Sequence, residues 1–220
     1  MIVAIDGPSG SGKSSCARLA ARALGFVYID TGALYRAIGL AVRLAGGDTK
    51  NEARVEQCLP GLQLRIQYIE GTQHVFLGGR DVSEEIRTPE SAMAASDVAR
   101  MPAVRAFLLE LQRGLARAQS SIMDGRDIGT VVLPDADVKI FLTASPEERA
   151  RRRWLELQAK GLDDSYEKVL AEVVARDEAD MGRAISPLRP AEDSILLDTT
   201  GMAQDAVVRA IIDIAKEKQP

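Results

Sequence analysis

Residues Gly7-Pro8-Ser9-Gly10-Ser11-Gly12-Lys13-Ser14 form a complete G-x-x-x-x-G-K-[ST] phosphate-binding loop near the N-terminus. The loop follows the apolar run Ile2–Ile5 and precedes a stretch typical of a helix, Ser15–Leu24. This strand–loop–helix context separates a working phosphate loop from a chance match in a Gly/Ser-rich linker. Glycines let bare backbone N–H groups face an anion, and the N-terminus of the next helix directs further N–H groups at it. The sequence therefore predicts a nucleoside triphosphate site, with Lys13 on the outer phosphates and the Ser14 hydroxyl on Mg²⁺.

The composition is that of an ordinary globular protein, with 220 residues, 46% hydrophobic and 27% charged. A net charge of −4 argues against nucleic-acid and membrane partners, and no apolar run approaches the roughly 20 residues that span a bilayer. Two cysteines, Cys16 and Cys58, and an N-terminus that enters a strand at once favour a reducing cytoplasm. One histidine, His74, disfavours zinc sites and Ser/His/Asp catalysis. We expect a single domain over residues 1–220 that is a monomer.

Short apolar runs alternate with helical stretches along the chain, which predicts a doubly wound α/β fold with a five-stranded parallel sheet. The predicted strands are Ile2–Asp6, Phe26–Asp30, Ser121–Asp124, Val138–Leu142 and Ile195–Asp198. The predicted helices are Ser15–Leu24, Ala33–Ala45, Pro102–Gln119, Pro146–Lys160 and Ala203–Lys216. In such a fold, ligands bind at the carboxyl ends of the strands.

Residues 58–90 break this alternation and predict a small antiparallel insert. Leu62–Ile69 alternates with period 2, Glu70–Gln73 contains a glycine, and His74–Leu77 is a second short run. This pattern is typical of a hairpin with one solvated face. Its place after the helix carrying Tyr35 and Arg36 favours a mobile flap on the substrate side, although a decorative surface hairpin would show the same pattern.

The second predicted strand ends in Asp30-Thr31-Gly32-Ala33-Leu34-Tyr35-Arg36. We expect Thr31 to cap the following helix and Arg36 to lie on its first turn, facing the same crevice as the phosphate loop. A cation there opposes the helix dipole, so an anionic partner would explain it. A solvated arginine remains the alternative.

The third predicted strand leads into Asp124-Gly125-Arg126-Asp127. Asp124 falls where a phosphate-loop enzyme places the acid that orients Mg²⁺ and its waters. Arg126 and Asp127 would set a bidentate phosphate clamp beside an acceptor carboxylate. The alternative is a local ion-paired turn.

Two groups of charged residues recur at helical spacing further along. Arg149, Arg152 and Arg153 are spaced i, i+3, i+4, and we expect them to share a face; the same holds for Arg176, Asp180 and Arg183 at i, i+4, i+7. Taken alone, such runs are more often solvated helix surface. Beside a phosphate loop they fit phosphoryl transfer, which needs positive charge and positioning around the moving group rather than covalent chemistry.

Taken together, these motifs resemble the cytidylate kinases, a bacterial family of nucleoside monophosphate kinases. The resemblance covers essentially the whole chain, including the insert near residues 58–90. Its markers are Ile5–Ser14, Asp30–Arg36, Asp124–Thr130, Lys139–Leu142 and Arg176-Asp177.

The resemblance implies transfer from MgATP to CMP or dCMP, with a helical lid at about 148–168. It implies roles by position in the motifs. Gly7, Pro8, Ser9, Gly10, Ser11, Gly12, Lys13, Ser14 and Ser15 would hold ATP, and Ser14 with Asp124 (through water) would hold Mg²⁺. Lys13, Asp124, Arg126, Arg149 and Arg153 would be catalytic. Arg36, Arg126 and Arg183 would bind the acceptor phosphate, Ser96, Arg105 and Asp127 the cytosine, Arg176 and Asp180 the sugar, with Thr31 and Tyr35 beside them.

This chain departs from the family pattern in having Thr31 where serine is usual and Ser14-Ser15 where Gly-Thr is frequent. Both changes keep a hydroxyl. Three other classes remain to be weighed. A shikimate-type kinase would not need the insert, an adenylate or uridylate kinase would not need Ser96, Arg105 and Asp127, and a regulatory GTPase would need an Asn-Lys-x-Asp motif that the chain lacks.

Overall fold

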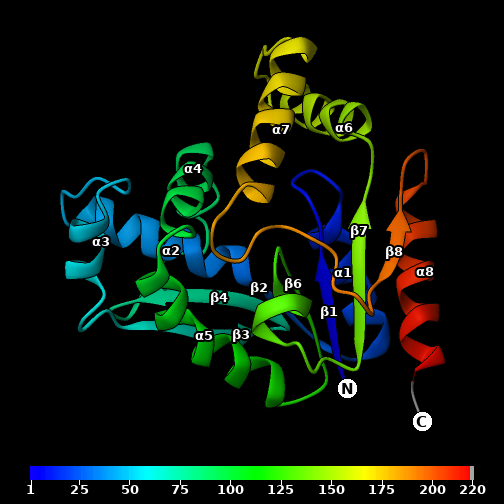
Figure 1. Ribbon diagram of the computed structural model, residues 1–220, viewed down its shortest axis with the longest axis horizontal. Coiled ribbons are helices and arrows are strands. Elements are labelled where there is room, and N and C mark those ends of the chain that lie inside the picture. Colours follow the sequence, from blue (N-terminus) through cyan, green and yellow to red (C-terminus); the bar gives the residue numbers. More distant parts are fainter. Residues whose placement is uncertain (219–220) are drawn as a thin grey trace.

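The computed structural model describes residues 1–218 and has a parallel five-stranded sheet at its centre (Figure 1). The strand order is β2-β6-β1-β7-β8, and every neighbouring pair is parallel. The strands are β1 (Ile2–Asp6), β2 (Val27–Asp30), β6 (Ser121–Gly125), β7 (Val138–Thr143) and β8 (Ile195–Asp198). The predicted α/β fold is therefore confirmed, with strand ends that differ by at most one residue.

Helices connect these strands. They are α1 (Lys13–Leu24), α2 (Thr31–Leu44), α3 (Glu52–Cys58), α4 (Pro89–Val98), α5 (Pro102–Arg117), α6 (Pro146–Ala159), α7 (Tyr166–Met181) and α8 (Gln204–Glu217). A single-turn π-helix, η1 (Ile128–Val132), follows β6. Helices α3 and α4 and the π-helix lie where the sequence pattern predicts no element. The first is short, and α4 is rich in small residues, so neither carries a clear apolar stripe.

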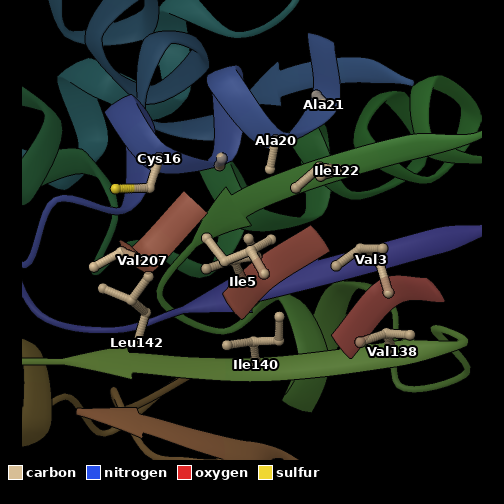
Figure 2. Packing of buried hydrophobic residues seen from close by; sticks show 13 residues of the cluster. Val3, Ile5, Cys16, Ala20, Ala21, Ile122, Val138, Ile140, Leu142 and Val207 are labelled. Carbon is tan, nitrogen blue, oxygen red and sulfur yellow. The ribbon is translucent and has the colours of Figure 1, made fainter. Parts of the chain in front are cut away.

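The central strands β1 and β6 are buried on both faces, which explains their near-continuous apolarity, whereas the edge strand β8 is largely exposed. Val3 and Ile5 of β1 pack with α1 and α8, as Figure 2 shows, whereas Ala4 points to the opposite face, against α5 and η1. Successive side chains of a strand alternate between faces, so β1 contributes to both cores.

The insert is a second sheet of three antiparallel strands, β3 (Leu64–Ile69), β4 (Thr72–Leu77) and β5 (Arg80–Asp81). The predicted hairpin is confirmed, but β3 begins two residues later than expected and its turn is only Glu70-Gly71, both at positive φ. Ile66 of its inner face packs in the same cluster as helix α2. The insert therefore lies directly behind the helix that carries Tyr35 and Arg36.

Helices α6 and α7 stand beyond the carboxyl end of β7, above the phosphate loop (Figure 1). Between residues 1 and 218, no helix has the length and apolarity needed to cross a membrane. The carboxyl edge of the sheet is thus enclosed by α2 and α4 on one side and by α6 and α7 on the other.

Candidate active site

The phosphate loop connects β1 to α1 through three glycines at positive φ, Gly7, Gly10 and Gly12, where any other residue would be strained. Gly7 has φ +151°, and a Cβ there would lie 1.9 Å from the carbonyl oxygen of Leu142. Gly12, at φ +88°, is the N-cap of α1, which begins at Lys13, two residues earlier than predicted. Lys13 is buried, and its Nζ donates to the carbonyl of Pro8 at 2.7 Å. Burial, together with repulsion from Arg126, lowers the pKa of Lys13, so an anion beside it would restore its charge.

A cavity of about 360 Å³ opens at the carboxyl edge of the sheet, between this loop and helices α2, α4, α6 and α7. It is lined by most of the predicted site residues: Ser9, Gly10, Gly12, Lys13, Ser14, Ser15, Thr31, Tyr35, Arg36, Arg105, Asp124, Arg126, Asp127, Arg176 and Arg183. Arg152, one of the predicted lid arginines, also lines it, as do Asp30 and Glu156, which were not among the predicted site residues. The recurrence of aspartate at strand ends is the signal that points to Asp30.

Asp124 lies at the end of β6, beside the first turn of α1. Its Oδ2 accepts from the Ser14 hydroxyl at 2.7 Å, and its Oδ1 accepts from the Tyr28 hydroxyl at 2.9 Å. Burial and the neighbouring charge of Asp30 raise the pKa of Asp124, opposed by Lys13. A hydroxyl and a carboxylate are the hard oxygen donors that suit Mg²⁺, which takes few protein ligands and keeps waters and phosphate oxygens. Within residues 1–218 no group of three or more His, Cys, Asp or Glu is arranged to hold a metal ion.

Asp30, not Thr31, caps helix α2. The Asp30 carboxylate accepts from the backbone N–H of Ala33 at 3.0 Å, while the Thr31 hydroxyl donates to the carbonyl of Asp124 at 2.8 Å. The expected cap at Thr31 is therefore wrong, because the helix starts one residue earlier in the turn. Arg36 lies on the second turn, not the first, and its anionic partner in the protein is Asp30, at 2.7 Å.

Arg105 and Asp127 form a buried ion pair at the far end of the cavity. The guanidinium also donates to the carbonyl of Ala99 at 3.0 Å and lies 5.7 Å from the centroid of the Tyr35 ring. The carboxylate of Asp127 thus meets a cation from α5 rather than its neighbour Arg126, so the local ion-paired turn is wrong. Ser96 is buried on α4 but does not line the cavity.

Asp180 is fully buried and receives three guanidinium groups. Arg126 donates to it at 2.8 Å, Arg176 at 3.3 Å and Arg183 at 2.5 Å. Burial opposes ionisation of Asp180, but the three cations together lower its pKa. Burial also lowers the pKa values of Arg176 and Arg183. Helix α7 ends at Met181, so Arg183 reaches Asp180 from the loop and not from the predicted shared helical face.

This cluster leaves excess positive charge facing the cavity, since three cations surround one carboxylate. The Nε atom of Arg183 is buried and has no hydrogen-bond partner among the described residues, and the same is true of Arg36. Buried donors of this kind are costly unless they are paired. Both arginines line the same cavity, where an anion can satisfy these donors.

The predicted lid arginines do not share one environment. Arg149 is buried, pairs in a bidentate manner with Asp177 of α7 and donates to the carbonyl of Ser9 in the phosphate loop at 3.1 Å. Arg153 is half-exposed and pairs with Glu156, which itself lines the cavity. Of the three, only Arg152 lines the cavity. The three arginines lie on one face of α6 as predicted, but their side chains enter different environments, because Arg149 is buried against α7, Arg152 lines the cavity and Arg153 is half-exposed.

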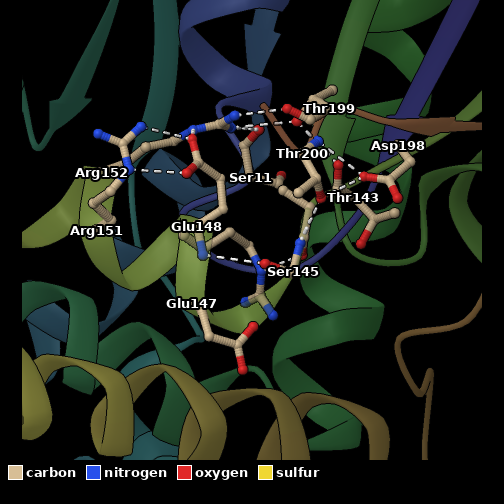
Figure 3. A network of polar contacts seen from close by, with 12 residues as sticks. Ser11, Thr143, Ser145, Glu147, Glu148, Arg151, Arg152, Asp198, Thr199 and Thr200 are labelled. Atoms are coloured by element: carbon tan, nitrogen blue, oxygen red, sulfur yellow. Dashed lines mark hydrogen bonds and ion pairs between the residues drawn. The ribbon is translucent and has the colours of Figure 1, made fainter. Parts of the chain in front are cut away.

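Figure 3 shows Arg152 between the phosphate loop and the segment after β8. Its guanidinium donates to Glu148 at 2.9 Å, to the carbonyl of Ser11 at 3.3 Å and to the carbonyl of Thr199 at 2.7 Å. Together with Arg149, it connects α6 to the phosphate loop. Its spacing from Arg149 is the sequence signal for this role.

Asp6, the last residue of β1, joins the phosphate loop to the segment that follows β6. Its carboxylate accepts from the backbone N–H groups of Ile128 at 2.8 Å and Gly129 at 2.7 Å. These are the first residues of the π-helix, directly after Asp127. Asp6 was not among the predicted site residues, and its buried acceptor role is visible only when β1 and β6 are paired.

Comparison with known proteins matches residues 3–217 to the family model described as cytidylate kinase. The chain belongs to the cytidylate kinase family. The chain is 50% identical over 219 residues to the cytidylate kinase of Mycobacterium leprae, covering 99% of this chain and 96% of that one. It is 47% identical over 212 residues to that of Caldicellulosiruptor bescii, covering 96% and 94%.

Among solved structures, an uncharacterized protein from Eubacterium ventriosum is similar in fold, with a TM-score of 0.54 at 13% identity. The match covers 99% of this chain and 98% of that one. Within the cytidylate kinase family, this chain is therefore an ATP-dependent phosphotransferase. Its phosphate loop and its arginine cluster open into one shared cavity, so a phosphoryl donor and an anionic acceptor can meet there.

Proposed function

We propose that this protein transfers the γ-phosphoryl group of ATP to CMP or dCMP, giving ADP and CDP or dCDP. The observation that carries this proposal is the single cavity that contains Lys13 of the phosphate loop together with Arg36, Arg126 and Arg183. One end suits a triphosphate, the other a monophosphate. Membership of the cytidylate kinase family supports the same reaction.

On the donor side, we assign Gly7–Ser15 to the ATP phosphates. The backbone N–H groups at the start of α1 and the Lys13 ammonium would hold the transferred group, and Arg152 would approach it from α6. Bound Mg²⁺ would neutralise charge between the β- and γ-phosphates, and Ser14 with Asp124 (through water) would hold it. Arg149 would act in catalysis by fixing α6 and α7 over the phosphate loop through Ser9 and Asp177. Arg153, which does not line the cavity in this structure, would need a movement of α6 to reach the phosphates.

On the acceptor side, we assign the phosphate of CMP to Arg36, Arg126 and Arg183. The free buried donors of Arg36 and Arg183 support this assignment. Arg176 and Asp180 would lie beside the sugar. Transfer itself then requires positioning and positive charge, which the converging arginines supply.

We assign cytosine to Asp127, Arg105 and Ser96, with Tyr35 beside Arg105. Ser96 does not line the cavity in this structure, so it would need a movement of α4 to reach the base. Cytosine donates from its exocyclic amine and accepts at N3 and O2, so it suits a carboxylate, a cation and a hydroxyl. Uracil has a carbonyl where cytosine has the amine, and that carbonyl would face Asp127. The buried position of the Arg105–Asp127 pair supports this role, because the pair is shielded from solvent at the end of the cavity.

The Asp127→Asn variant tests the assignment. The amide of the introduced asparagine can donate to the O4 atom of uracil. We therefore expect kcat/KM for CMP to fall, and the ratio of kcat/KM for CMP to kcat/KM for UMP to decrease by at least about tenfold. Steady-state kinetics with both monophosphates measures this ratio. Asp135→Asn, at an exposed aspartate paired with Arg117, is the matched control and should leave the ratio unchanged. A wild-type ratio in Asp127→Asn would show that cytosine is read elsewhere, by Ser96 and Arg105.

We also propose that the protein works in the cytoplasm as a monomer, where ATP is available as donor. Its two cysteines, Cys16 and Cys58, are both free thiols, which fits a reducing compartment. Sedimentation equilibrium tests the oligomeric state, and cell fractionation tests the location.

A further inference from the structure

The insert is attached to the outer edge of the central sheet by side chains. Strand β2 is the edge strand and, in the described part of the chain, pairs only with β6. On its free side, the hydroxyl of Tyr68 donates to the carbonyl of Tyr28 at 3.3 Å. The amide of Gln73 makes two hydrogen bonds with Asp30, accepting from its N–H at 2.9 Å and donating to its carbonyl at 3.1 Å.

The two residues of the hairpin that make these contacts have the same spacing as the two residues of β2 that they contact. Tyr68 and Gln73 are direct cross-strand partners in the hairpin of β3 and β4. Tyr28 and Asp30 are two residues apart, so their backbone groups point to the same side of β2. Gln73 thus occupies the place that a further strand would take at the edge of the sheet, at its carboxyl end.

Every polar group of Asp30 takes part in a hydrogen bond. Its backbone N–H and carbonyl bond to Gln73, one carboxylate oxygen caps α2 through the N–H of Ala33, and the other bonds to Arg36. Arg36 in turn lines the main cavity, and its buried Nε has no partner among the described residues. A continuous chain of hydrogen bonds therefore runs from the tip of the insert to an arginine of the cavity.

We propose that Gln73 is a positioning residue for the acceptor phosphate. By fixing the backbone of Asp30, it sets the direction of the carboxylate that orients the Arg36 guanidinium. This inference rests on the proposed role of Arg36 in binding the phosphate of CMP. In this proposal the insert has a definite function, because it fixes the orientation of the Arg36 guanidinium from outside the cavity.

The test compares Gln73→Met with Gln67→Met. Methionine keeps the length of the side chain and removes both hydrogen bonds. Gln67 lies on the exposed face of β3, and its side chain makes no hydrogen bond within residues 1–218, so the same substitution there is the control. Titration calorimetry measures the affinities for CMP and for cytidine, which lacks the phosphate.

We expect Gln73→Met to weaken CMP binding by about three- to tenfold, the effect of one or two neutral hydrogen bonds. The affinity of Gln73→Met for cytidine and its KM for ATP should stay within about twofold of wild type. In Gln67→Met, the affinities for CMP and cytidine and the KM for ATP should all stay within the same limit. A purely structural role would weaken both ligands alike. Equal loss for CMP and cytidine, or no loss for either, overturns the inference.

Arg36→Met separates this inference from the role of Arg36. If Arg36→Met leaves the ratio of CMP to cytidine affinity unchanged, the proposed role of Arg36 fails. If Arg36→Met lowers the ratio and Gln73→Met does not, only the inference about Gln73 fails. The double variant should bind CMP no more weakly than Arg36→Met alone, because the two residues act in one chain of contacts. Additive losses would contradict the proposal.

Gln73→Glu is a second variant, in which a carboxylate faces the Asp30 carbonyl. It should also lower the ratio of CMP affinity to cytidine affinity.

Discussion

At the scale of single residues, long charged side chains in this protein find partners far from their sequence neighbours. Arg126 pairs with Asp180, 54 residues away, although Asp127 is adjacent to it. Asp127 pairs with Arg105 of α5. The motif Asp124–Asp127 therefore supplies three side chains to three different contacts, which is why one short segment can serve the metal, the phosphate and the base in the proposed reaction.

Asp6 gives a prediction at this scale. Burial, opposed by the N–H groups of Gly129 and Ile128, raises the pKa of Asp6 from 3.8 to about 6. Between these two pH values the folded protein keeps a proton that the unfolded chain has lost, so the free energy of unfolding falls as pH rises through this window. Between pH 4 and pH 7, we expect the free energy of unfolding of the wild type to fall by up to about 3 kcal/mol relative to that of Asp6→Asn.

Urea unfolding of both proteins across this pH range measures the difference, in which the contributions of other groups cancel. The hydrogen bonds that the Asn variant loses add a constant offset and do not affect the slope. A difference that stays the same at every pH would mean that Asp6 is ionised throughout.

At the scale of elements, the contact between α2 and α4 depends on Gly39. A Cβ added there would lie 2.7 Å from the Cβ of Ala94, so alanine would force the two helices apart. Overpacking of this kind costs about 1–3 kcal/mol and outweighs the gain of about 1 kcal/mol in helix propensity. We therefore expect Gly39→Ala to lower the free energy of unfolding by up to about 2 kcal/mol and to weaken CMP binding, because α4 lines the cavity.

Gly114, on the exposed side of α5, has open space around it and is the matched control. The same substitution there should stabilise the protein by about 0.5–1 kcal/mol. Chemical denaturation measures both variants. Stabilisation by Gly39→Ala equal to that by Gly114→Ala would show that α2 and α4 separate freely.

At the scale of the whole molecule, the cavity unites segments from the phosphate loop to Arg183, almost the length of the chain. A ligand that binds there should stabilise the fold as one unit. We expect CMP at about 100 times its Kd to add about 2.7 kcal/mol to the free energy of unfolding and to raise Tm by about 5–10 °C. Differential scanning calorimetry measures this, and one transition should shift as a whole. Cytidine at the same concentration should raise Tm by less than CMP does. A second transition whose Tm does not change would contradict unfolding as a single cooperative unit.

The sequence by itself determined the phosphate loop, the five strands and the hairpin, because each depends on local chemistry. Glycine spacing, apolar runs and period-2 alternation need no knowledge of distant residues. Tertiary structure alone decided which arginines face the cavity. Arg152 lines it, while Arg153, one residue later, is half-exposed and does not, and Asp30 rather than Thr31 caps α2. The reason is physical: a guanidinium on a flexible stem pairs with whichever carboxylate the folded sheet brings near, and that choice is made only when β1, β6, α5 and α7 meet at one edge.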